Sequence, residues 1–185
     1  RLGTGADDYE PFLTEQGHAG QEFAHGVGNN TFIYRPWHLP EHVHPTTWTA
    51  REMARLTVRR DPTRPAFWYM SFDHVHPPLT PPSDYWALYE DIDIDMPLVG
   101  EWAKELDQMP FALRTRPHPF MQPFMSDQEI RTARRAFYAL STQVDHQIRT
   151  VIGTLREEGV LDDTIVMFTA DHSDMLGSHG IWGKG

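Results

Sequence analysis

The chain of 185 residues contains no cysteine, which excludes disulfide bridges, thiolate metal sites and a cysteine nucleophile within it. It also lacks any apolar run of about eighteen residues, the length at which a transmembrane helix would be expected. Basic residues are few: 16 Lys and Arg stand against 26 Asp and Glu, for a formal net charge of −10. This excess of negative charge disfavours binding to nucleic acid or to an anionic membrane. The length is sufficient to bury one core.

The segment from residue 164 to residue 185 carries the densest chemical pattern. Residues 164–170 are mostly apolar, β-branched or aromatic, which predicts a buried strand. Asp171 and His172 follow at once, and a glycine-rich stretch comes next; open α/β sheets bind their ligands at such strand ends. A carboxylate oxygen and an imidazole nitrogen supply half of a divalent-metal site, and Lys184 would bring a cation to an anionic substrate. The alternative is a turn-capping Asp, a surface His and a solvated Lys.

A second apolar run, residues 66–72, predicts another strand with both faces covered. His74 and His76 stand just beyond its end, and prolines follow directly after His76. Proline restricts the backbone, so this exit would hold a histidine at a fixed geometry. Without a wider pattern, a hydrogen-bonded structural histidine remains the alternative.

Two long motifs resemble those of the sulfatases, in the alkaline-phosphatase-like superfamily. Residues 163–185, DTIVMFTADHSDMLGSHGIWGKG, are similar to the second metal motif of that family. Residues 65–82, PAFWYMSFDHVHPPLTPP, are similar to its strand and loop with a sulfate-contacting histidine. The resemblance implies an α/β fold, part of a three-layer sandwich with a mostly parallel central sheet. It also implies that residues 1–185 are an internal portion of one catalytic domain, without the N-terminal nucleophile region and the C-terminal region.

The resemblance assigns a role to each candidate site residue. Asp171 and His172 would be metal ligands. His76 and Lys184 would contact the sulfate and act in catalysis, and His74, where relatives vary, is a further substrate-binding candidate. The implied reaction is metal-assisted hydrolysis of an aryl or carbohydrate sulfate ester, a small-molecule or carbohydrate substrate. Relatives most often use Ca²⁺, but a His ligand is softer than a Ca²⁺ site prefers, so Mn²⁺ or Mg²⁺ stays open.

The family's nucleophile is a formylglycine made from Cys or Ser in a C/S-x-P-x-R motif. Ser83, Ser126 and Ser141 are not followed by Pro and Arg at that spacing. We therefore expect the nucleophile and two further metal carboxylates to lie outside this chain, and the chain alone to be inactive. Ser173 stands where relatives usually have glycine, and it would be strained by about a kcal/mol if that position required a positive φ.

Two other functions remain open at this point. A phosphonate or phosphodiester hydrolase of the same superfamily would share the Asp-His metal pair. A non-catalytic module would use an incomplete metal site as structure or for weak anion capture. The sequence also leaves open the exact substrate, the oligomeric state, and whether the protein works in a bacterial cytoplasm or periplasm.

Four helices are predicted from caps and periodicity. Capping boxes at residues 49–52 and 126–129 each begin a helix, the first with Trp48 and Met53 as a hydrophobic staple and the second ending at Gly159. Shorter helices are expected over residues 9–16 and 83–89, the second capped by its first residue. An irregular excursion is expected over residues 90–123.

A histidine-rich loop spans residues 37–45. His38, His42 and His44 with Glu41 suit a zinc site by residue type. Structural zinc sites usually include Cys, and the prolines at both ends suit a rigid loop better than a ligand-bearing helix. We interpret the loop as structural or as part of a substrate pocket.

Overall fold

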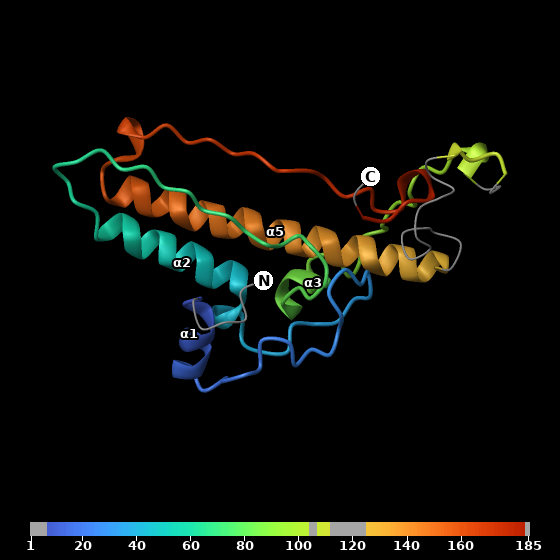
Figure 1. Ribbon diagram of the computed structural model, residues 1–185, viewed down its shortest axis with the longest axis horizontal. Helices are drawn as coiled ribbons and strands as arrows, with labels where there is room; N and C mark the ends of the chain where they lie inside the picture. The colour runs from blue at the N-terminus through green and yellow to red at the C-terminus, as the bar shows by residue number, and fades with distance from the viewer. Residues whose placement is uncertain (1–6, 104–106, 112–124, 184–185) are drawn as a thin grey trace.

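The computed structural model describes residues 7–103, 107–111 and 125–183. Helix α5 (Asp127–Glu157) is the long axis of the molecule, and α2 (Pro45–Val58) packs along its C-terminal half (Figure 1). Four shorter elements complete the first half of the chain: α1 (Tyr9–Glu15), η1 (Glu41–Val43), α3 (Ser83–Ala87) and η2 (Glu101–Ala103). Two 3₁₀ helices, η5 (Leu161–Asp163) and η6 (Ser178–Gly180), follow α5. Within the described residues, no helix has both the length and the apolar character needed to cross a membrane.

Both ends of α5 form as the sequence predicts. The Ser126 side chain accepts a hydrogen bond from the Glu129 backbone N–H at 3.3 Å, and the Glu129 carboxylate accepts one from the Ser126 N–H at 2.7 Å. This reciprocal pair satisfies two N–H groups that have no partner within the helix. At the other end Gly159 adopts φ 69°, the left-handed conformation that closes a helix with little steric cost in glycine.

The predicted start of α2 at Thr49 is wrong, because the helix begins at Pro45. His44 is its N-cap, and its ring Nδ1 accepts a hydrogen bond from the Thr46 backbone N–H at 3.2 Å. Proline is well suited to the first helical position, where an N–H would lack an intrahelical partner. Glu52, the expected partner of Thr49, instead forms an ion pair with Arg55 one turn on.

The predicted staple between Trp48 and Met53 is also wrong, since the two side chains belong to different clusters. Trp48 packs on α1, with its ring 5.2 Å from that of Tyr9. Met53 packs with Ala50 and with Val151 of α5. The helix α2 therefore packs on α1 through Trp48 and on α5 through Met53.

The short helix α3 forms as predicted, but its first residue is not the cap. The N-cap is Pro82, which makes no side-chain hydrogen bond. The helix predicted over residues 9–16 is confirmed as α1, which is followed by Gly17 at φ 82°.

Residues 66–72 are extended, but the prediction that both faces are covered is wrong. Trp68, Met70 and Phe72 pack against the cluster between α2 and α5, as one face of a strand would. On the opposite face Phe67 is 91 % exposed and Tyr69 81 % exposed. Alternate side chains of an extended chain point to opposite faces, so the helices cover only one of them.

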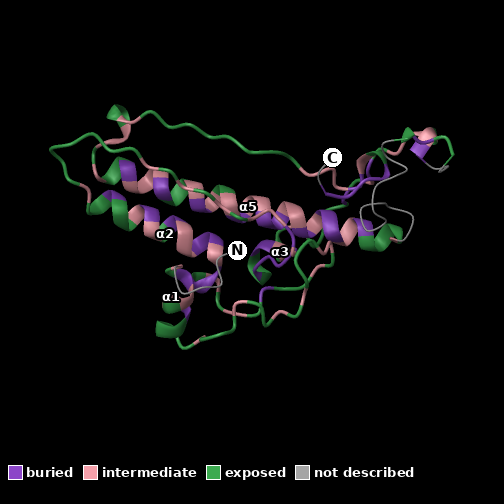
Figure 2. Cartoon of the chain, in the orientation of Figure 1, coloured by how far each residue is buried: buried purple, intermediate pink, exposed green. Residues whose placement is uncertain are grey.

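Residues 164–170, predicted to be a buried strand, are extended and exposed (Figures 1 and 2). Ile165 is 91 % exposed, Met167 85 % and Phe168 80 %. A strand becomes buried through pairing with neighbouring strands and covering layers. Among the described residues, β-pairing is limited to isolated bridge positions, including a parallel bridge between Tyr34 and Leu79. The apolar run thus has its predicted conformation without its predicted burial.

The main core cluster lies on the N-terminal half of α5. It combines four residues of the helix with one residue from each sequence motif: Ile130, Ala133, Ala136, Leu140, Leu79 and Trp182. The sequence predicts an apolar stripe over residues 130–155, with apolar residues every three or four positions. Five of its members are buried (Ile130, Ala133, Leu140, Val151 and Leu155), and four are only partly buried (Phe137, Val144, Ile148 and Ile152). The stripe is thus confirmed in part, and the buried side of α5 also includes Arg134, Gln143 and Gln147. Because Leu79 and Trp182 pack on the same helix, the loops that contain them are held at one end of α5.

Candidate active site

Asp171 and His172 lie at the end of the extended segment 164–170, and both are exposed. Their side chains contact each other: His172 Nε2 lies 3.2 Å from Asp171 Oδ2, and the His172 backbone N–H donates to Asp171 Oδ1 at 2.9 Å. A carboxylate and an imidazole are suitable donors for a divalent cation. No group of three or more potential metal ligands occurs among the described residues. The pair therefore fits part of a coordination shell.

A closed loop, residues 174–183, follows this pair directly. Asp174 Oδ1 accepts hydrogen bonds from the backbone N–H groups of Leu176 at 2.9 Å and Gly183 at 3.3 Å. The Met175 N–H donates to the Gly183 carbonyl at 2.9 Å, which brings the two ends of the loop together. We refer to residues 174–183 as the closed loop. The two ends of the closed loop are thus held together by the Asp174 carboxylate and by the backbone hydrogen bond between Met175 and Gly183.

Ser173 just before the closed loop is not among the described residues with positive φ, so the predicted strain at this serine is not observed. The left-handed conformations occur further on, at Leu176 (φ 50°) and His179 (φ 55°), and at three glycines. Of these glycines, Gly177 also packs tightly, because a Cβ there would come within 2.9 Å of the Pro97 side chain.

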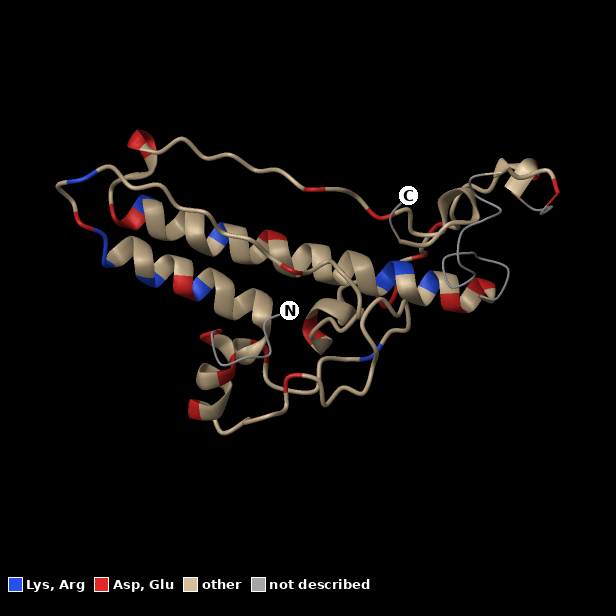
Figure 3. Ribbon diagram, in the orientation of Figure 1, with Lys and Arg blue, Asp and Glu red and all other residues tan. Residues whose placement is uncertain are grey.

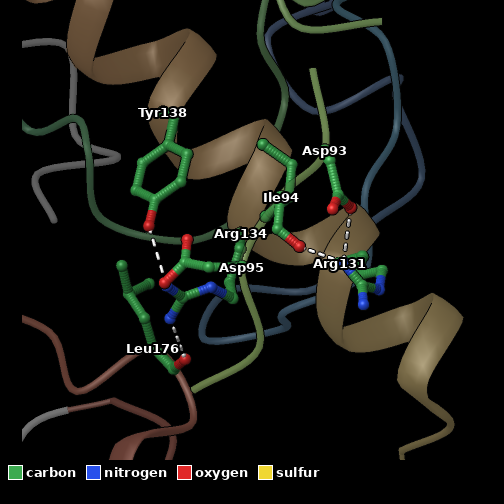
Figure 4. A network of polar contacts seen from close by, with 7 residues as sticks. All are labelled: Asp93, Ile94, Asp95, Arg131, Arg134, Tyr138 and Leu176. Atoms are coloured by element: carbon green, nitrogen blue, oxygen red, sulfur yellow. Dashed lines mark hydrogen bonds and ion pairs between the residues drawn. The ribbon is translucent and has the colours of Figure 1, made fainter. Parts of the chain in front are cut away.

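Two side chains fix the closed loop to the body of the molecule. Trp182 is 1 % exposed within the α5 cluster, and its ring lies 5.1 Å from that of Phe32. Arg134 of α5 donates from Nη1 to the Leu176 carbonyl at 3.0 Å and from Nη2 to Asp95 at 2.9 Å (Figure 4). The loop after the candidate metal ligands is therefore tied to the longest helix.

His76 occupies a turn that follows the extended segment 66–72. Its backbone N–H donates to the Asp73 carbonyl at 3.0 Å, and its ring Nδ1 pairs with the carbonyl of Pro77. Val75, the preceding residue, packs against the same core cluster as Leu176 of the closed loop. The two motifs are thus brought to the same end of α5 through the neighbours of the predicted site residues.

His74 points toward the start of α2. Its Nδ1 lies 3.1 Å from Thr46 Oγ1, and its ring centre is 4.7 Å from that of His44. Burial lowers the pKa of His74 to about 4, with Asp73 opposing the shift and nearby His76 adding to it. His74 is therefore neutral at pH 7, and it can offer a hydrogen bond but not a charge.

His44 is completely buried beside His74. Burial, reinforced by His74, lowers the pKa of His44 well below its usual range. Its contribution is the N-cap of α2. In the same histidine-rich loop, Glu41 accepts a hydrogen bond from Tyr85 at 3.1 Å, and His38 Nε2 pairs with the Gln21 carbonyl at 2.7 Å. These contacts give the loop a structural role.

Lys184, the remaining predicted site residue, lies outside the described residues, as does part of the excursion predicted over residues 90–123. Two residues that shape the site were not singled out from the sequence: Asp174 and Arg134. The signal for Arg134 is its spacing, since it stands four positions after Ile130 and so falls within the apolar stripe of the helix. A charged residue in a buried stripe requires partners, which here are the closed loop and Asp95.

Comparison with known proteins gives a consistent family. The chain is 36 % identical over 180 residues to an arylsulfatase of Clostridium perfringens, an alignment that includes 97 % of this chain and 37 % of that protein. It is 37 % identical over 123 residues to a choline-sulfatase of Rhizobium meliloti, over 65 % of this chain and 24 % of the relative. The chain thus spans little more than a third of the first of these relatives and about a quarter of the second.

The fold has counterparts among solved structures. The phosphonate monoester hydrolase of Agrobacterium radiobacter superimposes with a TM-score of 0.79 at 22 % identity, over 97 % of this chain and 38 % of that one. At this identity the likeness shows a shared fold and no more. Residues 8–185 match the Sulfatase family. The chain belongs to the sulfatase family.

Proposed function

We propose that this chain forms part of the active site of a sulfatase that hydrolyses an aryl or carbohydrate sulfate ester, as an internal portion of one catalytic domain. The observation that carries the proposal is the closed loop: it is fixed at both ends by Asp174, follows Asp171 and His172, and leads directly into Lys184 in the sequence. The family match over residues 8–185 supports the same reaction.

Cleavage of a sulfate ester develops negative charge on the sulfuryl oxygens and on the leaving oxygen, so it needs cations and hydrogen-bond donors arranged beforehand. In the proposal His76 and Lys184 bind the sulfate oxygens, and one of them protonates the leaving group. His74, neutral at pH 7, adds a hydrogen bond. The nucleophile, a formylglycine, is supplied from outside this chain.

Asp171 and His172 are the proposed ligands of a divalent cation. Such a cation polarises a sulfuryl oxygen and orients and activates the nucleophile. Ca²⁺ is the proposed ion because the family most often uses it; the His172 nitrogen also suits Mn²⁺. Asp171 and His172 contact each other through their side chains, so cation binding would replace the Nε2–Oδ2 contact while leaving the backbone hydrogen bond to Oδ1 in place.

The extended segments 66–72 and 164–170 are proposed to be strands of a mostly parallel central sheet. Both have exposed apolar faces and unpaired edges, as strands would that lack their neighbours. Neighbouring strands would come from segments outside this chain, which aligns with 37 % of the arylsulfatase. In that sheet Ile165 and Phe168 would be covered.

Phosphonate monoester hydrolysis is the alternative, favoured by the fold likeness to two hydrolases of that class. The two reactions are separated by comparing kcat/KM of the complete protein on matched aryl sulfate and aryl phosphonate monoesters. The proposal predicts that the sulfate ester is the better substrate, by about tenfold or more. A clear preference for the phosphonate would replace it with the alternative. Absence of turnover on both, with metal bound, would favour a non-catalytic binding module.

A metal-replacement assay tests the cofactor separately. Chelation should abolish aryl sulfate turnover, and added Ca²⁺ should restore it at least as well as Mn²⁺ or Mg²⁺. Restoration by Mn²⁺ alone would change the proposed ion, and turnover that survives complete metal removal would exclude a metal role for Asp171 and His172.

A further inference from the structure

Arg134 is the buried cation of α5 that reaches the closed loop (Figure 4). Its side chain is 7 % exposed, whereas that of its ion-pair partner Asp95 is 74 % exposed. An ion pair with one partner so exposed is screened by water and contributes little. Arg134 also donates to the Tyr138 hydroxyl at 2.9 Å and lies over that ring at 5.7 Å. The remaining contact, to the Leu176 carbonyl, is the one that leads to the loop.

Leu176, which accepts the hydrogen bond from Arg134, has an unusual backbone conformation. It has φ 50°, a left-handed conformation that leucine rarely adopts and that persists only where the surroundings hold it. Its N–H is held by Asp174 at 2.9 Å and its carbonyl by Arg134 at 3.0 Å. Both backbone polar groups of the strained residue are thus fixed, one from within the loop and one from α5. A charged donor makes the second bond one of the stronger kind.

The closed loop connects Leu176 in the sequence to Lys184 on one side and to the metal-ligand pair Asp171 and His172 on the other. Asp174 bonds the N–H groups of Leu176 and of Gly183, so a shift of Leu176 is passed to Gly183. Lys184 is the next residue in the sequence, one peptide unit of about 3.8 Å from Gly183. In the other direction only Ser173 separates Asp174 from His172.

We infer that Arg134 is a positioning residue: by holding the Leu176 carbonyl it fixes the closed loop, and through the loop it supports the proposed site residues that flank this loop in the sequence. The inference rests on the proposed function for its effect on turnover. A displacement of about 1 Å at a catalytic group can lower a rate by up to about a hundredfold. Since Trp182 also anchors the loop, a smaller effect, near tenfold, is expected from loss of Arg134 alone.

Arg131 provides the matched control. It stands one turn earlier on α5, forms an ion pair with Asp93 at 2.9 Å and donates to the Ile94 carbonyl, and the hydrogen bonds that the described residues give it do not reach the closed loop. Figure 3 colours the basic residues at that end of α5 blue. In the complete protein, Arg134→Gln should lower kcat/KM on an aryl sulfate about tenfold, chiefly through kcat, whereas Arg131→Gln should stay within about twofold. Arg134→Lys, which can still donate to one carbonyl, should recover part of the loss.

A double-mutant cycle distinguishes positioning from general destabilisation. If Arg134 acts through Lys184, then Arg134→Gln should have little further effect, less than about twofold, in a Lys184→Ala background. An equal loss in both backgrounds would overturn the inference, and so would a wild-type rate for Arg134→Gln. If Arg134→Gln does not fold, the double-mutant cycle with Lys184→Ala is measured with Arg134→Lys instead.

Amide hydrogen exchange tests whether Arg134 holds the closed loop and requires no enzymatic activity. A failure of the inference can therefore be told apart from a failure of the proposed function. Arg134→Gln should speed amide exchange at Leu176, Gly177 and Gly183 by about tenfold or more, and Arg131→Gln should leave these amides unchanged. Unchanged exchange in Arg134→Gln would contradict the inference, even in an active enzyme. Faster exchange in a protein without sulfatase activity would leave the anchor supported and the proposed function refuted.

Discussion

Arg134 Nη1 donates a hydrogen bond to the carbonyl oxygen of Leu176 at 3.0 Å, across 42 positions of sequence. This bond joins the helix that organises the core to the loop that follows Asp171 and His172. It also explains why a guanidinium is kept at a position that is 6 % exposed: the backbone carbonyl of a left-handed leucine needs a donor there. The candidate site is therefore supported from α5.

Lys184→Ala in the complete protein should lower kcat/KM by about a hundredfold or more, roughly 2.7 kcal/mol, comparable to removal of one oxyanion donor. A lysine next to flanking glycines can approach a sulfate oxygen closely and meet its charge as it develops. Metal content, measured by elemental analysis, should stay at the wild-type level because Lys184 is not a proposed ligand. A near-normal kcat/KM with metal bound would remove Lys184 from the site.

Acid should destabilise the protein through His74 and His44. Both have pKa values below the usual 6.5 in the folded state, so the unfolded chain binds more protons as the pH falls. Stability should therefore decline as the pH falls below about 6.5, and the part of the decline that is due to His74 should level off below about pH 4, near its folded pKa. Thermal melts across this range measure the effect. His74→Asn, which cannot titrate there, should flatten the curve, and an unchanged pH profile in that variant would assign the acid sensitivity elsewhere.

Truncation of a buried apolar side chain should lower the unfolding free energy far more than truncation of an exposed one. Leu140 is 0 % exposed, so Leu140→Ala should cost about 2–5 kcal/mol of unfolding free energy. Ile165 is 91 % exposed, so Ile165→Ala should change stability of this chain by less than about 0.5 kcal/mol. Urea unfolding of both variants provides the comparison. In the complete protein, where a sheet is proposed to cover residues 164–170, Ile165→Ala should cost as much as a core truncation. A negligible cost there as well would argue against the sheet.

The cap of α5 should contribute measurably to stability. Ser126→Ala removes the capping box and should lower the unfolding free energy by about 1 kcal/mol. Ser141→Ala is the control, because the Ser141 hydroxyl only bonds back to the Phe137 carbonyl within the helix at 2.9 Å. Equal unfolding free energies for the two variants would mean that the Ser126–Glu129 capping box does not stabilise the helix.

The sequence predicted the features that depend on neighbouring residues. The cap at Ser126 and the glycine end at Gly159 follow from local spacing and are confirmed, and the apolar stripe of α5 is confirmed in part. The start of α2 was missed because a histidine ring nitrogen replaces the usual Ser or Thr, and Pro45 follows it. Standard capping patterns do not include that substitution.

The features that depend on distant residues could not be predicted in the same way. The apolar composition of residues 164–170 predicts an extended conformation, but burial depends on neighbouring strands, which the described residues do not provide. Likewise, Arg134 falls in the apolar stripe, but nothing local names Leu176 as its partner. The family resemblance supplied the roles of Asp171, His172, His76 and Lys184, and these roles remain proposals.

The aryl sulfate kcat/KM of Asp171→Ala, measured in the complete protein with its metal content, tests the metal-assisted reaction most directly. Asp162→Ala, which removes an exposed carboxylate of η5, is the matched control. We predict that Asp171→Ala loses both the bound metal and turnover, by about a thousandfold or more, while Asp162→Ala keeps both. Retention of metal and of near-wild-type turnover in Asp171→Ala would contradict a metal site at Asp171 and His172.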